Sequence, residues 1–186
     1  MRGGGRRWAA GTLAVAALAA LPAGERPARP LAAAERAPCR VLRVFDGDTI
    51  AVRCSGRADR VRYIGINAPE THHPTRGQEP GGREATAANV RLVGGRTVRL
   101  ETDVQVRDVH DRLLAYVWVR EPGGREVMAN ARMLALGYAR LMTIPPNVRH
   151  VKQFVELQQE ARRAGRGLWS VWSSPGGART GDRPRP

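Results

Sequence analysis

The chain has 186 residues and a formal net charge of +14, from 31 basic and 17 acidic side chains. This length is enough for one domain with a hydrophobic core and excludes two such domains. A strongly basic chain attracts polyanions, which makes nucleic acid the expected partner. Lys152 is the only lysine. Genomic base composition would explain that bias toward arginine, but not the excess of basic over acidic residues.

Residues 1–23 have the three parts of a secretory signal, namely early arginines, the apolar run Trp8–Leu21 and small residues that end at Ala23. The run is too short for a membrane span, which needs about 20 apolar residues. We expect cleavage after Ala23, with Ala34 as the second choice, and an uncleaved N-terminal anchor is the alternative. The sequence therefore predicts a secreted or periplasmic (cell-envelope) protein without stable membrane insertion.

Two further segments are too rich in proline, glycine and arginine to form a core. Residues 24–38 predict a linker, and residues 171–186, where serine is also frequent, predict a disordered tail. The folded domain is therefore expected to cover residues 39–170.

The first predicted elements are two strands, Cys39–Phe45 and Asp48–Cys54, joined by a two-residue hairpin loop at Asp46-Gly47. In that register Cys39 lies opposite Cys54. Opposed residues on antiparallel strands are about 4.5 to 5.5 Å apart at Cα, which is within disulfide range. Because an exported protein meets an oxidising compartment, we expect a disulfide. Two free thiols or a metal-binding pair are the alternatives.

Strand and helix signals then alternate along the rest of the chain. Four more strands are predicted, at Arg60–Ile66, Thr97–Thr102, Leu113–Val119 and Tyr138–Met142. Three helices are predicted, at Glu84–Leu92, at Val127–Leu136, and from Asn147 as N-cap to Gly165. Five or six strands, with helices after the third strand and near the end, predict an OB-fold. This is a five-stranded barrel with about three helices, mainly β within the α+β class.

Three stretches carry the residues with chemical potential: Asp46–Ile50, Arg62–Glu70 and Asp111–Tyr116. A phosphodiester is an anion that gains charge as water attacks it. Its hydrolysis needs a cation on the phosphate, positioned guanidinium groups and a carboxylate that deprotonates the water. The three stretches supply acids and two arginines, which is the set that a metal-dependent phosphodiesterase requires.

Together with Glu70–Ala85 and Gly165–Trp169, these stretches resemble the staphylococcal nuclease family of secreted, calcium-dependent thermonucleases. The match runs in order from about Cys39 to Trp169. A lone Asp-Gly-Asp-Thr would be ordinary turn chemistry, whereas five ordered matches are specific. The resemblance implies the OB-fold and the hydrolysis of phosphodiester bonds.

The resemblance also implies a calcium (Ca2+) site. Asp48 corresponds to a direct ligand, Asn67 to the second ligand, and the backbone carbonyl of Ala68 to the third. Asp46 and Thr49 are interpreted as residues that support the turn. The type enzyme has aspartate where this chain has Asn67, and an amide oxygen brings no formal charge, so calcium affinity should fall. The alternative for Asp48 is a plain turn residue.

Three residues match the catalytic groups of the family. Glu70 corresponds to the proposed general base, and Arg62 and Arg112 correspond to the arginines that clamp the scissile phosphate. A guanidinium suits this task because its fork binds two phosphate oxygens and stays charged. A solvated loop glutamate and solvated surface arginines are the alternatives. Arg60 and Arg62 share one face of their strand, so only the motif selects Arg62.

Other positions depart from the family. His110 and Thr143 stand where the type enzyme has tyrosines near the nucleotide, and Asp111 stands where the family often has glycine. The base preference therefore cannot be transferred. The adjacent His72 and His73 could suggest a transition-metal site, but adjacent histidines diverge, which favours a solvated loop.

The sequence thus predicts a secreted, calcium-dependent nuclease, a monomer that hydrolyses DNA, with RNA as a second possible substrate. A non-catalytic OB-fold module that binds nucleic acid is the alternative. Asn67 favours that alternative, while retention of Asp48, Arg62, Glu70 and Arg112 argues against it. A third interpretation, a basic exported protein that binds an envelope polyanion, leaves the motifs unexplained.

Overall fold

The structure is a computed structural model that describes residues 38–71, 77 and 79–172. The expected signal peptide, nearly all of the linker, and both His72 and His73 lie outside these residues. Most of the expected tail does too, although its first two residues belong to a short helix. None of the helices within the described ranges has the length and apolar character that a membrane crossing demands.

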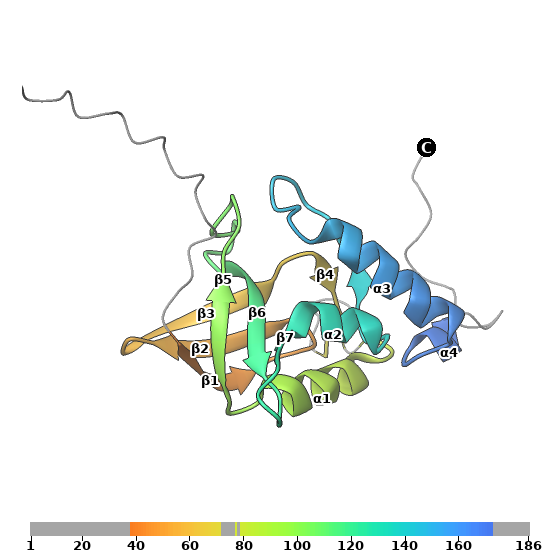
Figure 1. Cartoon of the computed structure of the whole chain (residues 1–186), viewed down its shortest axis with the longest axis horizontal. Coiled ribbons are helices and arrows are strands. Elements are labelled where there is room, and N and C mark those ends of the chain that lie inside the picture. The colour runs from red at the N-terminus through yellow and green to blue at the C-terminus, as the bar shows by residue number, and fades with distance from the viewer. Residues whose placement is uncertain (1–37, 72–76, 78, 173–186) are drawn as a thin grey trace, which may run out of the picture. The chain divides into compact units, whose positions relative to one another are not determined.

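Five strands of the described chain form a closed barrel (Figure 1). They are β1 (Cys39–Val44), β2 (Thr49–Cys54), β3 (Arg57–Tyr63), β5 (Thr97–Glu101) and β6 (Leu113–Arg120). Their order is β3-β2-β1-β5-β6, and a parallel pairing of β3 with β6 closes the ring. The OB-fold prediction is confirmed.

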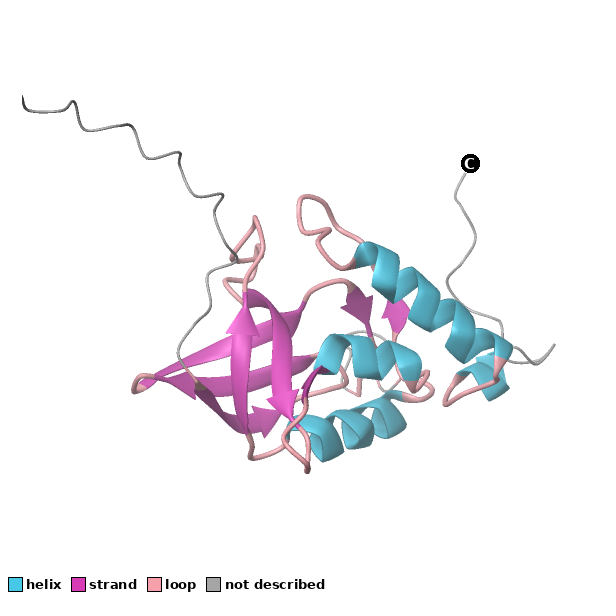
Figure 2. Cartoon of the chain, viewed as in Figure 1, coloured by secondary structure: helices cyan, strands magenta, loops and turns pink. Residues whose placement is uncertain are grey.

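The remaining elements lie around this barrel (Figure 2). They are β4 (Ile66–Asn67), α1 (Gly82–Val93), β7 (Glu126–Met128), α2 (Ala129–Ala135), β8 (Arg140–Leu141), α3 (Val151–Arg163) and α4 (Trp169–Trp172). The strands β4 and β8 form a separate antiparallel pair, and β7 extends the barrel sheet beyond β6.

Two of the predicted helices begin later than expected. The helix expected from Val127 begins only at Ala129, because the preceding residues pair with the end of β6 as β7. The last helix begins at Val151, and Asn147 does not cap it. The buried Asn147 side chain instead bonds both backbone groups of Gln105, at 2.7 and 2.8 Å.

The predicted disulfide between Cys39 and Cys54 is present, with the two Cα atoms 4.3 Å apart. The predicted two-residue hairpin loop is wrong, because Val44 pairs with Ile50 and the loop is one residue longer. A bulge at Leu42 adds one residue to β1 and restores the register, so that Cys39 still faces Cys54. The pairing is therefore correct although its premise is not.

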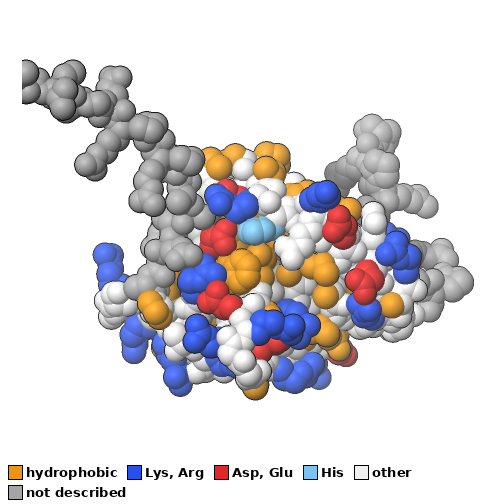
Figure 3. Space-filling view, viewed as in Figure 1, with side chains coloured by type: hydrophobic (Ala, Val, Ile, Leu, Met, Phe, Trp, Pro, Cys, Tyr) orange, Lys and Arg blue, Asp and Glu red, His pale blue; other side chains and the backbone are white. Residues whose placement is uncertain are grey.

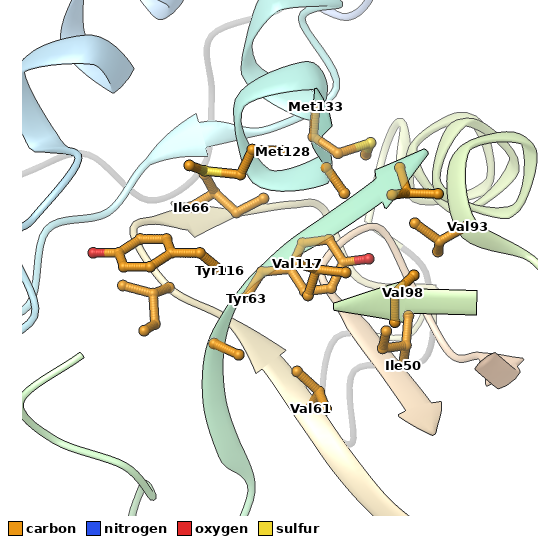
Figure 4. Packing of buried hydrophobic residues seen from close by; sticks show 14 of the residues in the cluster. Ile50, Val61, Tyr63, Ile66, Val93, Val98, Tyr116, Val117, Met128 and Met133 are labelled. Carbon is orange, nitrogen blue, oxygen red and sulfur yellow. The ribbon is translucent and has the colours of Figure 1, made fainter. Parts of the chain in front are cut away.

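The core fills the barrel and the space between the barrel and its helices. Figure 4 shows Tyr63 and Tyr116 among aliphatic side chains from the strands, with Met128 and Met133 contributed from the β7–α2 segment. In β3 the inward Val61 and Tyr63 are buried, while the residue between them faces outward and is partly exposed. That outward residue is Arg62. The barrel thus presents Arg62 on a rigid strand.

Candidate active site

The turn between β1 and β2 carries the first acidic residues of the site. The side chain of Asp46 accepts a hydrogen bond from the backbone N–H of Asp48 at 2.9 Å, which folds the turn on itself. Gly47 lies against Ala68 and Ala85, and a Cβ at this position would overlap the Cβ of Ala68. Only glycine therefore lets the turn pack against the chain after β4, and this packing directs Asp48 inward.

A buried asparagine on α1 holds this turn in place. The side-chain N–H2 of Asn89 donates to the backbone carbonyl of Asp46 at 2.9 Å. Its carbonyl oxygen accepts a hydrogen bond from the Tyr63 hydroxyl at 3.0 Å. Burial raises the pKa of Tyr63, so the hydroxyl stays protonated and remains a donor. Sequence analysis missed Asn89, and the available signal was a polar side chain on the apolar face of a helix.

A second buried asparagine supports the strand that follows. Asn130, at the start of α2, donates to the carbonyls of Ile64 and Ala115 and accepts the N–H of Val117. It therefore ties α2 to β6 and to the connection between β3 and β4. That connection leads directly to Asn67.

Asp48, Arg62 and Asn67 form one contact cluster. A terminal nitrogen of Arg62 lies 3.0 Å from Oδ2 of Asp48, and the other donates to the side-chain oxygen of Asn67 at 2.9 Å. Arg62 also donates to the backbone carbonyls of Tyr63 and Ile66. The strands bring these groups together because Thr49, next to Asp48, pairs with Arg62 across β2 and β3. The guanidinium is held by four groups at once.

Asp48 is an unusual carboxylate because it is almost fully buried, with 4% of its surface exposed. Its Oδ2 accepts the backbone N–H of Ala68 at 2.6 Å, and its Oδ1 accepts the Thr49 hydroxyl at 3.1 Å. Burial raises the pKa of Asp48 to about 7, against the lowering effect of Arg62, and the neighbouring charge of Asp46 raises it further. The site thus carries buried negative charge that a cation would stabilise.

The donor atoms at this point fit a hard divalent cation. Asp46 and Asp48 bring carboxylates, Asn67 an amide oxygen and Ala68 a backbone carbonyl, all of which are oxygen ligands of the kind calcium takes. Within the described ranges, no cluster of three or more acidic, histidine or cysteine side chains could hold a metal. A cation here would therefore depend on the amide and carbonyl oxygens, and it would compete with Arg62 for the oxygens of Asp48 and Asn67.

Glu70 follows β4 in a loop whose backbone is fixed from two sides. Its carbonyl accepts the N–H of Glu79 at 2.9 Å, and its own N–H donates to the Glu79 carboxylate at 3.1 Å. A Cβ at Gly82, the first residue of α1, would come within 2.6 Å of the Glu70 carbonyl oxygen, so helix and loop pack closely only with glycine there. The half-buried Glu70 thus has a fixed backbone.

Arg112 immediately precedes β6, and its neighbour Leu113 pairs with Val61 of β3. This parallel pairing places Arg112, just before β6, beside the strand that carries Arg62. Asp108 accepts from Nε of Arg112 at 2.7 Å and from its backbone N–H at 3.0 Å. The two terminal nitrogens of Arg112 form no hydrogen bond with the described residues, so these donors are available to a bidentate anion. Sequence analysis missed Asp108.

Hydrogen bonding also sets the ionisation of Asp108. Burial opposes ionisation, but the hydrogen bonds from the backbone and side chain of Arg112 and from the backbone of His110 outweigh it. The pKa of Asp108 is therefore lowered. The carboxylate remains charged and keeps Arg112 oriented.

Three positions at which this chain differs from the family lie in loops of the structure, at His110, Asp111 and Thr143. Asp111 has φ 59°, in the left-handed region that glycine favours, which accounts for glycine at this position in the family. The Asp111 carboxylate lies 3.5 Å from the guanidinium of Arg107, which also donates to the Asp111 backbone carbonyl at 2.6 Å. The charge of Asp111 is therefore paired with Arg107 and not with Arg112. His110 and Thr143 are exposed.

The structure therefore joins Asp48, Arg62 and Asn67 directly and places the backbone of Ala68 beside them. Glu70 and Arg112 come from adjoining segments and form no hydrogen bond or ion pair with this cluster. Whether these residues perform the roles assigned to them stays a prediction.

Comparison with known proteins gives the family. Residues 60–171 match the family described as Staphylococcal nuclease homologue. The thermonuclease of Staphylococcus hyicus is 37% identical over 131 residues, which cover 70% of this chain and 75% of that protein. The thermonuclease of Staphylococcus intermedius is 35% identical over 69% of this chain and 74% of its own length. Endonuclease YncB of Bacillus subtilis (strain 168) is 38% identical over 130 residues, which cover 69% of this chain and 59% of that protein. The chain belongs to the staphylococcal nuclease homologue family.

Proposed function

We propose that the protein is an exported, calcium-dependent endonuclease that hydrolyses phosphodiester bonds in DNA, with RNA as a second substrate. Membership of a nuclease family makes the chain a phosphodiester-hydrolysing enzyme. The observation that carries the finer proposal is the buried Asp48 carboxylate, held by Arg62 in a site lined with oxygen atoms. Such a site favours positive charge at the point where a phosphate would bind.

The two arginines bind and polarise the phosphate in this proposal. Arg112 offers both terminal nitrogens, because Asp108 engages only its Nε. Arg62 lies on a barrel strand, where Asp48 and backbone carbonyls limit its movement. Preorganised donors of this kind stabilise the charge that develops on the phosphoryl oxygens, because they need little rearrangement during the reaction.

Glu70 acts as the general base. It takes a proton from a water molecule as that water attacks phosphorus, and the bond from phosphorus to the 5′-oxygen breaks; the 5′-oxygen leaves with the bonding electrons and takes a proton from solvent to become a hydroxyl. The fixed backbone of Glu70 limits where its carboxylate can reach, which favours a defined position for the water. Asp48, Asn67 and the carbonyl of Ala68 would hold calcium, which when bound supplies positive charge against the phosphate oxygens.

Export rests on the sequence of residues 1–23, and the disulfide between Cys39 and Cys54 is consistent with it. Disulfides persist in secreted and periplasmic proteins and are rare in reducing compartments.

The test of the catalytic assignment is Glu70→Gln, which keeps the size of the side chain and removes its basicity. Cleavage of DNA should fall about 100-fold or more, while binding of DNA in chelator stays within a factor of about two. Glu84→Gln is the control, because it removes an exposed carboxylate from the first turn of α1. Unchanged cleavage by Glu70→Gln, in protein free of contaminating nuclease, would show that the base lies elsewhere.

The same experiment examines the alternative, a non-catalytic module that binds nucleic acid. Such a module would bind DNA in wild-type form and cleave none of it at any calcium concentration. The weaker donor at Asn67 is the one feature that favours this alternative.

A further inference from the structure

An open pocket of about 450 Å³ lies on the outer face of the barrel, beside the candidate active site. It is lined by Phe45, Ala51, Arg60, His110 and Arg112, together with Ala58, Asp59 and Asp111. Of the residues assigned to catalysis or metal binding, it includes only Arg112. The pocket therefore adjoins the site and shares Arg112 with it.

Two of the lining residues, Ala51 and Arg60, are in register with Arg43, which lies beside the pocket lining. Ala51 of β2 pairs with Arg43 of β1 on one side and with Arg60 of β3 on the other. The short alanine side chain leaves space between the two long ones. Both guanidinium groups extend over the ring of Phe45, with their central carbons 4.9 Å and 4.4 Å from its centroid. The result is an aromatic ring flanked by two cations.

No acidic side chain in the described ranges pairs with Arg43 or Arg60. The acids that line the pocket are engaged elsewhere, since Arg107 lies 2.6 Å from Asp59 and 3.5 Å from Asp111. The two guanidinium groups contact the same ring and are therefore within about 10 Å of each other, one Debye length at 0.1 M salt. Their mutual repulsion is unrelieved, and a bound anion would relieve it.

The surrounding surface has the same sign of charge. Exposed arginines continue on the same face of β1 and β2 at Arg40 and Arg53. Figure 3 shows basic side chains along the left edge of the molecule, over the tip of the β2–β3 hairpin, without acidic side chains beside them. A polyanion that reaches this face therefore meets positive charge along its path.

The pocket is aligned with the phosphate-binding arginines. Arg60 and Arg62 lie on the same face of β3, two residues and about 6.6 Å apart. A strand whose phosphate contacts Arg62 and Arg112 would reach the pocket with a neighbouring nucleotide. Aromatic rings and arginine planes stack on bases of any sequence, and guanidinium groups bind phosphate.

We propose that this pocket is a second binding site for the substrate, specific for single-stranded nucleic acid. An unpaired base stacks on Phe45 as a guanidinium group moves off the ring, and Arg43 and Arg60 bind the adjoining phosphate. The proposal rests on the proposed nuclease function for the identity of the ligand, and it assigns a role to residues outside the catalytic set.

Binding is tested in chelator, where cleavage is suppressed, with a short fluorescent single-stranded DNA. Phe45→Ala should weaken binding about fivefold or more, because stacking on an aromatic ring contributes that much per base. Arg60→Ala should reduce the slope of log affinity against log salt by about 0.7, the value for one phosphate contact on a single strand. The controls are Leu42→Ala, an exposed apolar residue of β1, and Arg163→Ala, an exposed arginine of α3.

Inorganic polyphosphate separates stacking from charge, because it has no bases. Phe45→Ala should leave polyphosphate binding unchanged, whereas Arg60→Ala should weaken it. Equal losses for polyphosphate and DNA in Phe45→Ala would overturn the stacking role. Thermal melting of each variant confirms that it is folded.

Cleavage of an abasic dinucleotide, two deoxyriboses joined by one phosphodiester, and of a long single strand distinguishes this proposal from the proposed function. The abasic substrate has no base to stack on Phe45, so Phe45→Ala should cleave it at the wild-type rate and show a raised KM only for the long strand. If the wild-type protein cleaves both substrates and Phe45→Ala matches it on both, the pocket proposal is wrong. If the wild-type protein cleaves neither substrate, and Phe45→Ala still binds the fluorescent DNA more weakly, the pocket proposal stands and the nuclease assignment fails.

Discussion

Asn89→Ala is expected to destabilise the protein strongly, although Asn89 touches no proposed ligand or catalytic side chain. The substitution removes two hydrogen bonds, one to the Asp46 carbonyl and one from the Tyr63 hydroxyl. Each bond contributes about 1 kcal/mol to stability, and a buried group left without a partner costs about 1 to 3 kcal/mol more. Because Tyr63 is 2% exposed, water does not replace the lost acceptor. We therefore expect a loss on the order of 3 kcal/mol in the free energy of unfolding, from a total that is usually about 5 to 15.

Urea unfolding, followed by tryptophan fluorescence, measures this loss, and a double-mutant cycle with Tyr63→Phe isolates its cause. Tyr63→Phe alone should destabilise by about 1 kcal/mol, because Asn89 loses a partner. In the Asn89→Ala background the same change should be neutral or stabilising, because it removes a hydroxyl without an acceptor. Since Asn89 also holds the turn of Asp46, Asn89→Ala should require more calcium for half-maximal activity. Strictly additive losses in the cycle would refute this reasoning.

Three further outcomes are expected. Asn67→Asp adds a carboxylate where Arg62 now binds an amide oxygen, and calorimetry should show tighter calcium binding. Equal or weaker calcium binding would remove Asn67 from the ligand set. Reduction of the bond between Cys39 and Cys54, which are 15 residues apart, should lower stability by about 3 kcal/mol, whereas an unchanged urea midpoint with reductant would contradict this. Burial raises the pKa of Asp48 to about 7 in the folded protein, from 3.8 in the unfolded chain. In chelator, protonated Asp48 therefore adds to the free energy of unfolding in full below pH 3.8, and this contribution is lost as the pH rises through 7. The melting temperature should therefore fall from pH 5 to pH 8 in chelator and recover with calcium, and a rise over that range would count against the assignment.

The barrel could be predicted from sequence because its signals are local. Alternating burial in β3 and the turn residues at Asp46-Gly47 need only a few neighbouring residues to be recognised. The bulge at Leu42 was not predictable in this way, because it depends on how β1 twists against β2. The register error and the bulge cancel, so the disulfide was predicted correctly from an incorrect loop length.

The parts of the site that were missed are the ones that depend on contacts distant in sequence. Asn89 bonds a carbonyl 43 residues away, and nothing in the helix that contains it identifies that partner. Asp108 is closer to Arg112, but only the folded loop shows that its carboxylate engages Nε and leaves the terminal nitrogens open. The motif supplied Arg62, and the structure adds that it bridges Asp48 and Asn67.

The most direct measurement of the central claim is cleavage of plasmid DNA by the purified protein, with calcium, with magnesium and with chelator. Asp48→Asn tests the proposed cation site in the same assay. The account predicts cleavage with calcium, none with chelator, and a calcium requirement that rises sharply in Asp48→Asn. Cleavage that persists in chelator, or a folded protein that binds DNA and leaves it intact at saturating calcium, would contradict it.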